Sequence, residues 1–340
     1  MTHRKSPSWS SSLLRRDLSA RANHLAHTQN LLHEISPGSD SAVIFGRDEQ
    51  GRHGNFHPAS YTNICANPAW LRRLTKVHTA SRRSRARKDW QWMELDSCNS
   101  SDALLMNIFC HPAVFNGHAL SPAIANLLNI EPTTQPCFGI NPGVPLKNVR
   151  KGRTNLPPNL TDQTEIDLQL GNLFLEAKLT ESGFQTAAPR LIERYCDLGT
   201  IFDTARLPRK IIYAPASHPP VEDLSQIEEE NQEIREEESK QKKNNMPYQS
   251  LHSPASSRVV IQGYQLIRNV LAAYASDASF CVLCDARRHD LIETWYSVLS
   301  AVHSPTFAAR LKLLTWQELA AILPKDLQQF LEAKYGILPA

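Results

Sequence analysis

The chain has 340 residues, of which 41% are hydrophobic and 21% are charged, and its formal net charge is only +3. That length is enough for one large domain or two ordinary ones with a real hydrophobic core. No run of about 18 apolar residues occurs, and the first residues lack the apolar stretch of a secretory signal. The seven cysteines are irregularly spaced. We therefore expect a globular protein of the reducing cytoplasm, with no membrane partner and no disulfide framework.

Residues 1–91 predict a poorly ordered or helical N-terminal region, with a helix near 12–34. A basic run without any acidic residue occupies 72–88. Such a run can bind the phosphates of nucleic acid. Its candidate nucleic-acid-binding residues are Arg82, Arg83, Arg85, Arg87 and Lys88. A solvated arm without a ligand is an equally good interpretation.

A capped helix is predicted next, because Ser100 suits an N-cap position, an apolar stretch follows it, and Pro112 stops it. Residues 131–163 contain many Pro, Gly and Asn residues and predict a loop.

The stretch 164–180 has the alternating pattern of two short strands. Gly171-Asn172 between them suits a two-residue hairpin turn, which pairs Leu170 with Leu173. The apolar side chains then share one face of the hairpin: Ile166, Leu168, Leu170, Leu173, Leu175, Ala177 and Leu179. The acids and a lysine share the other face.

In this register the charged residues of the hairpin oppose one another in pairs. Asp167 lies opposite Glu176, and Glu165 lies opposite Lys178. Directly paired side chains have β-carbons about 5 Å apart, and like charges there repel. Asp167 and Glu176 therefore predict a Mg²⁺ site with Lys178 beside it, although both acids could be solvated on an exposed face. Glu165 and Lys178 form either an ordinary ion pair or, through Glu165, a second metal ligand.

The second half of the chain alternates between predicted helices and strands. We expect a helix at 188–203, a strand at 210–214 and an acidic low-complexity insertion at 216–257 within a single domain at 92–340. Val259–Tyr274 predicts an amphipathic helix whose polar side carries Gln262, Gln265, Arg268 and Asn269.

Two further strands and several helices complete the pattern. Residues 278–285 read as a buried strand, in which Cys281 and Cys284 are buried cysteines rather than a metal or redox pair. A helix at 288–302, a strand at 311–314 and a capping box at Thr315–Glu318 follow. The order of elements predicts an α/β protein with a mixed sheet covered by helices on both faces.

An aspartate followed by Glu-x-Lys on the next strand resembles the PD-(D/E)xK nuclease superfamily, with Ile166 where the name of the motif has proline. Further motifs occur in the order of a bacterial group of restriction-endonuclease-like proteins within that superfamily, across residues 92–338. These motifs are the stretches 100–109, 164–167, 175–184, 264–269 and 314–319. The resemblance implies a three-layer α/β/α sandwich with a central mixed sheet and Mg²⁺ (or Mn²⁺) as the cofactor.

The resemblance also assigns roles to individual residues. It implies catalytic roles for Asp167, Glu176, Lys178 and Gln265, and metal ligation by Asp167, Glu176 and the carbonyl group of Ala177. Glu94 is a candidate extra acid, and Glu181 is expected to have a supporting role.

The implied function is a metal-dependent nuclease that hydrolyses phosphodiester bonds. A DNA endonuclease of the restriction or repair type is the expected form, with DNA as its partner and a homodimer left open. The alternative is a catalytically inactive nucleic-acid-binding or interaction protein with the same fold.

Overall fold

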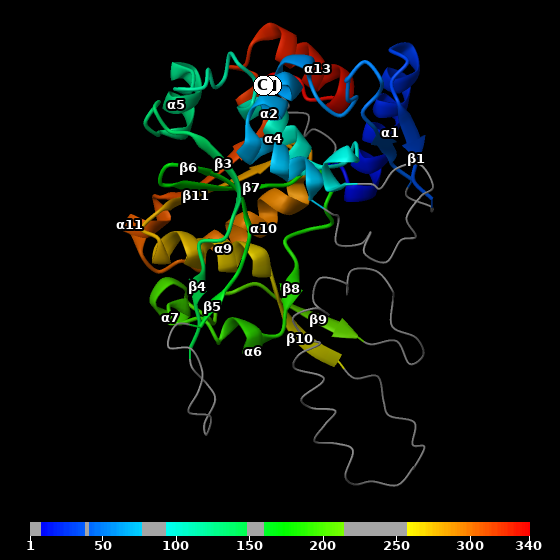
Figure 1. The fold of residues 1–340 in the computed structure, drawn as a ribbon. Helices are drawn as coiled ribbons and strands as arrows, with labels where there is room; N and C mark the ends of the chain where they lie inside the picture. Colours follow the sequence, from blue (N-terminus) through cyan, green and yellow to red (C-terminus); the bar gives the residue numbers. More distant parts are fainter. Residues whose placement is uncertain (1–7, 38–40, 77–92, 148–159, 214–256) are drawn as a thin grey trace, which may run out of the picture.

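The computed structural model describes residues 8–37, 41–76, 93–147, 160–213 and 257–340 (Figure 1). At its centre lies a five-stranded sheet with the strand order β12-β11-β7-β6-β3. These strands are β3 Pro136–Ile140, β6 Ile166–Leu170, β7 Leu173–Ala177, β11 Ser279–Cys284 and β12 Leu311–Thr315. β7 is parallel to β11 and antiparallel to β6, so the sheet is mixed and β7 is its central strand.

Helices cover both faces of this sheet and bury two separate apolar clusters. One face packs against α1 Ser11–Thr28, α2 Pro58–Ala66, α4 Ser101–Phe109, α12 Trp316–Ala320 and α13 Lys325–Tyr335. The other face packs against α9 Tyr264–Ala275 and α10 His289–Leu299. The three-layer α/β/α sandwich predicted from the sequence is therefore confirmed.

Smaller elements surround the sandwich. The short strands are β1 His33–Ile35 with β2 Val43–Phe45, β4 Val144–Pro145 with β5 Thr161–Asp162, and a sheet of β8 Thr186–Ala187, β10 Ser257–Gln262 and β9 Arg209–Tyr213. The short helices are α3 Pro68–Leu71, η1 Arg72–Thr75, η3 Glu94–Asp96, α5 Pro122–Leu128, α6 Pro189–Ile192, α7 Leu198–Ile201 and α11 Pro305–Ala308. Within the described ranges, every helix is too short or too polar to cross a membrane.

The first helices pack into the core of the sandwich rather than beside it. Leu14 and Leu18 of α1 and Tyr61 of α2 belong to the same cluster as Leu331 of α13. The core therefore crosses the boundary at residues 91 and 92 that the sequence pattern suggested. The candidate nucleic-acid-binding residues at 82–88, and all but the last residue of the predicted insertion at 216–257, lie outside the described residues.

The helix predicted at Val259–Tyr274 is wrong at its beginning. Residues up to Gln262 form strand β10, and α9 begins only at Tyr264. The β-branched run Val259-Val260-Ile261 favours a strand, and Gly263, with a φ of +73°, then turns the chain into the helix. Gln262 consequently lies on a strand and not on the polar side of α9.

Two other segments also differ from expectation. Part of the predicted loop at 131–163 is β3, an edge strand of the main sheet. The predicted helix at 188–203 is broken into α6 and α7.

Local capping signals and the cysteine prediction were more reliable. Ser100 Oγ accepts a hydrogen bond from the Ala103 N–H at 3.1 Å, and Thr315 forms the predicted capping box with Glu318. Cys281 and Cys284 are buried in β11 with free thiols, as predicted.

Candidate active site

The β6–β7 hairpin has the predicted turn, and Leu170 pairs with Leu173 across it. The ladder continues to Leu168 and Leu175 and then ends. Asp167 is therefore not in the predicted ladder pair with Glu176. Its Oδ2 instead accepts a hydrogen bond from the Ala177 N–H at 2.8 Å.

A distortion in the neighbouring strand accompanies this change. Gly139 of β3 has a φ of +63° and lies between the pairs Phe138–Leu168 and Ile140–Ile166, at the level of Asp167. Beyond this point Ile166 packs into the α9 side of the sheet, whereas Leu168 packs into the other side. The predicted apolar face is thus correct for the other residues of the hairpin and wrong for Ile166.

Glu176 has no exposed surface, and both of its carboxylate oxygens accept hydrogen bonds. Oε1 accepts from Gln265 Nε2 at 2.6 Å and lies 2.9 Å from Lys178 Nζ, while Oε2 accepts from Asn269 Nδ2 at 2.7 Å. Gln265 and Asn269 are one turn apart on α9, so they share one face of that helix. The structure thus brings together Glu176, Lys178 and Gln265.

Asn269 was not among the predicted site residues. Its signal in the sequence was its place four residues after Gln265 on the polar side of an otherwise apolar helix. A second polar residue at that spacing reaches the same neighbour.

The charges of this cluster influence one another strongly. Burial raises the pKa of Glu176, and burial together with the charge of Glu176 raises the pKa of Asp167. Burial alone would lower the pKa of Lys178, but the carboxylates of Glu176, Glu181 and Asp167 outweigh it and raise that pKa. Lys178 is therefore a cation at neutral pH, and the buried acids favour any additional positive charge.

A second ionic cluster adjoins the first. Glu165 does not pair with Lys178 as the register predicted, because it contacts Arg73 Nη2 at 2.7 Å and Lys76 Nζ at 2.8 Å. The same two cations contact Asp102 at 2.7 and 3.2 Å, and Lys76 also lies 3.1 Å from Glu94.

The guanidinium group of Arg73 links this second cluster to the hairpin. It lies against the backbone of Gly139, where an added Cβ would be 2.1 Å from Arg73 Nη1. A side chain at that position would displace the arginine. The absence of a side chain at residue 139 thus leaves room for the Arg73 guanidinium, whose pKa the acids Asp102, Glu165 and Asp167 raise against the effect of burial.

Arg73, Lys76 and Asp102 were not predicted as site residues. The two cations belonged to a run interpreted as phosphate-binding, and Asp102 to the first turn of a capped helix. Arg73 and Lys76 lower the pKa of Glu165 to about 2 although burial opposes this change. Burial raises the pKa of Glu94, with Lys76 opposing.

Glu181 fixes the chain immediately after β7. It accepts hydrogen bonds from Ser101 Oγ at 2.8 Å and from the Leu179 N–H at 2.7 Å. The buried Arg288 donates to the carbonyl groups of Leu179 and Glu181 at 3.2 and 2.8 Å. These bonds hold the segment that follows Lys178 in one conformation.

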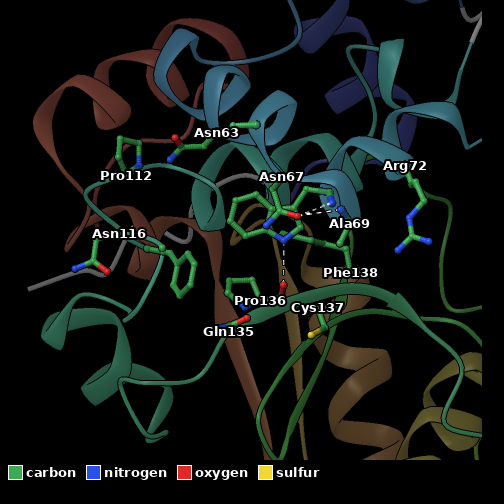
Figure 2. Close-up of a pocket in the computed structure, with 14 residues that line it drawn as sticks. Asn63, Asn67, Ala69, Arg72, Pro112, Asn116, Gln135, Pro136, Cys137 and Phe138 are labelled. Atoms are coloured by element: carbon green, nitrogen blue, oxygen red, sulfur yellow. Dashed lines mark hydrogen bonds between the residues drawn. The ribbon is translucent and has the colours of Figure 1, made fainter.

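A cavity of about 570 Å³ lies elsewhere, between α2, α3, the loop after α4, and β3. Trp70 lines this cavity, and its Nε1 donates to the Pro136 carbonyl at 3.1 Å. Figure 2 shows Asn63, Asn116 and Pro136 around the cavity. None of the predicted catalytic residues lines this cavity. It is therefore separate from the Asp167–Glu176–Lys178 site.

Comparison with known proteins places the chain in a family. No match was found among curated proteins or among solved structures. The model of one protein family, REase-ARP (restriction endonuclease associating with ARP), matches residues 22–336. This match covers the sandwich, both ionic clusters and most of the N-terminal region. The chain therefore belongs to the REase-ARP family of restriction-endonuclease-like proteins.

Proposed function

We propose that this protein is a metal-dependent DNA endonuclease of the restriction or repair type. Asp167 and Glu176 would hold Mg²⁺ or Mn²⁺, with the Ala177 carbonyl as a third ligand. The observation that carries the proposal is the buried carboxylate of Glu176, which contacts Lys178, Gln265 and Asn269 and whose charge helps to raise the pKa of Asp167. Lys178 compensates for one buried carboxylate, and a bound metal ion would compensate for the other.

The residues present fit such a metal ion. Asp167, Glu176 and the Ala177 carbonyl offer only oxygen ligands, which Mg²⁺ prefers while it retains several waters. Gln265 Oε1 is buried and has no hydrogen-bond partner, so it is suited to accept from a metal-bound water. When bound, the ion would supply positive charge to the phosphate and activate water.

The chain's own groups would bind and orient the reactants. Lys178 keeps its proton because the neighbouring carboxylates raise its pKa. It would therefore stabilise negative charge on the phosphate rather than act as a general base. Gln265 and Asn269 hold the Glu176 carboxylate in one orientation, which fixes the direction of the ligand oxygens.

The test compares DNA cleavage by the wild type and two site variants, Asp167→Asn and Lys178→Met. We expect the wild type to nick or cut plasmid DNA with Mg²⁺ or Mn²⁺ and not with EDTA. Each variant should lose about 100-fold or more in rate, as is usual when an electrostatic stabiliser is removed. Glu332→Gln and Lys325→Met, at exposed positions in α13, are the matched controls.

Circular dichroism confirms that each variant is folded before its rate is compared. Full activity in either site variant would contradict the assigned roles. A wild-type protein that binds DNA but cuts neither DNA nor RNA with these ions would instead support the catalytically inactive binding protein.

A further inference from the structure

Three potential metal ligands from separate parts of the chain meet at the end of the helical layer. They are His57 just before α2, His111 just after α4, and Asp326 in the first turn of α13. One ligand atom from each lies within 4.8 Å of the others. Asp326 Oδ2 is 3.3 Å from His111 Nε2 and 3.9 Å from His57 Nε2.

Hydrogen bonding does not account for this arrangement. His111 is only 3% exposed, and its Nε2 lies 3.3 Å from Asp326 Oδ2 without the geometry of a good hydrogen bond. His57 Nδ1 is likewise buried without a partner. Buried polar atoms are normally satisfied, so the poorly bonded Nε2 of His111, which faces Asp326, indicates a ligand.

We propose that His57, His111 and Asp326 form a Zn²⁺ site, with a fourth coordination position open to solvent. Two imidazole nitrogens and one carboxylate are a set of three protein ligands that zinc accepts in tetrahedral geometry. Ligand atoms in such a site lie about 3.3 Å apart, given metal–ligand bonds of about 2.0 Å. The His111–Asp326 contact already has this spacing, and His57 needs only a small movement.

The chemistry of the ligands distinguishes this site from the nuclease site. Imidazole nitrogens favour zinc and other late first-row ions over Mg²⁺, which prefers oxygen. The two sites are also apart, because Asp102 is at the start of α4 and His111 lies beyond its end, and this helix rises by about 12 Å from Ser101 to Phe109. The inference does not depend on the proposed nuclease activity.

The accessibility of the cluster suits ion entry. The Asp326 side chain is 59% exposed, whereas those of both histidines are largely buried. His111 Nδ1 accepts only a long hydrogen bond of 3.3 Å, from the Ala113 N–H. Metal binding at Nε2 would shift the ring proton to Nδ1, and only this weak contact with Ala113 would be lost. The ion would fasten α13 to α2 and to the end of α4, which lie together in Figure 1.

The test uses the full chain, stripped of metal by a chelator and then titrated. Zn²⁺ uptake is followed by calorimetry and by bound metal per chain, and Co²⁺ serves as a probe through its visible absorption. We expect one tightly bound Zn²⁺ per chain that excess Mg²⁺ does not displace, and a higher thermal midpoint with zinc. His111→Ala and Asp326→Asn should weaken binding by about 100-fold or more, because even outer partners of metal ligands contribute 10–100-fold.

Two controls should keep the affinity for zinc. They are His118→Ala, an exposed histidine in the loop after α4, and Asp167→Asn at the nuclease site. Asp326→Asn changes a side chain exposed enough for the variant to fold, which circular dichroism checks. Wild-type protein that takes up no stoichiometric Zn²⁺ would overturn the proposal. Unchanged affinity in folded Asp326→Asn and His111→Ala would do the same, as would loss of zinc in Asp167→Asn.

Discussion

Lys334 is buried without any carboxylate partner among the described residues, in contrast to Glu176, which has Lys178. The Lys334 ammonium donates to the Gly54 carbonyl at 3.1 Å and to Asn55 Oδ1, and it lies 4.3 Å from the centre of the Phe45 ring. Burial lowers the pKa of Lys334 to about 7, with Cys98 opposing. The folded protein therefore favours the neutral form of this amine.

The pH dependence of stability should report this buried amine. Between a pKa of about 7 in the folded state and about 10.4 in the unfolded state, only the unfolded chain holds the proton. Stability therefore rises with pH across this window, by about 1.4 kcal/mol per pH unit. The wild type should gain this much relative to Lys334→Met in urea unfolding at pH 8 and 9.

The exposed Lys325 in the same helix supplies the control variant, Lys325→Met, whose stability should follow the wild type at each pH. Parallel curves for the wild type and Lys334→Met would show that Lys334 keeps an ordinary pKa.

At the scale of elements, the junction between β10 and α9 positions the partners of Glu176. Gly263 supplies a left-handed conformation with a φ of +73° there. A Cβ at this residue would lie 2.7 Å from Val298 Cγ2 of α10. Both conformation and space therefore require glycine at the start of the helix that carries Gln265 and Asn269.

Gly263→Ala should destabilise the protein by about 1–3 kcal/mol, because it adds left-handed strain to a steric overlap. The midpoint of urea unfolding measures this change. Gly183→Ala is the matched control, since an added Cβ there meets no atom within 4 Å. A variant at 263 as stable as the one at 183 would show that the junction relaxes freely.

The elements that were predicted best from the sequence are those determined by residues close together in the sequence. Gly171-Asn172 determines the hairpin turn, and Ser100 and Thr315 determine helix starts, because each signal acts within a few residues. β3 was missed because its Pro- and Gly-containing sequence becomes a strand only through pairing with β6.

The same distinction applies to the candidate site. Glu176 and Lys178 were identified from the hairpin pattern and Gln265 from the family resemblance, and the structure brings the three together. The partners of Glu165 were not identified, because Arg73 and Lys76 are about 90 residues away in the sequence. Asp167 also departs from the predicted register. This change occurs beside Gly139, which lies on another strand, so the sequence around Asp167 does not reveal it.

At the scale of the whole molecule, the cations of the basic run 72–88 do not all have the same role. Arg73 and Lys76 contact acids inside the protein and are not free to bind phosphate. The remaining cations of the run are Arg72, which is exposed, and those at 82–88, which lie outside the described residues. Any salt-sensitive affinity of this run for DNA should therefore come from them.

Replacing Arg82, Arg83, Arg85, Arg87 and Lys88 by glutamine should weaken binding to duplex DNA and make it less sensitive to salt. If each cation neutralises one phosphate, the slope of log K against log salt concentration falls by about 4 to 5. Fluorescence anisotropy over a series of salt concentrations measures this slope, and Lys325→Met is the control. An unchanged slope would identify the run as a solvated arm.

The position of β7 in the sheet also has a consequence for biosynthesis. β6 precedes β7 directly, but the strand on its other edge, β11, and the helix that supplies Gln265 and Asn269 are translated much later. While the ribosome is still making these segments, Glu176 lacks its amide partners and the hairpin has an unpaired edge. Assembly of the Asp167–Glu176–Lys178 site thus waits for late translation, so an incomplete nascent chain does not yet hold these side chains in their final arrangement.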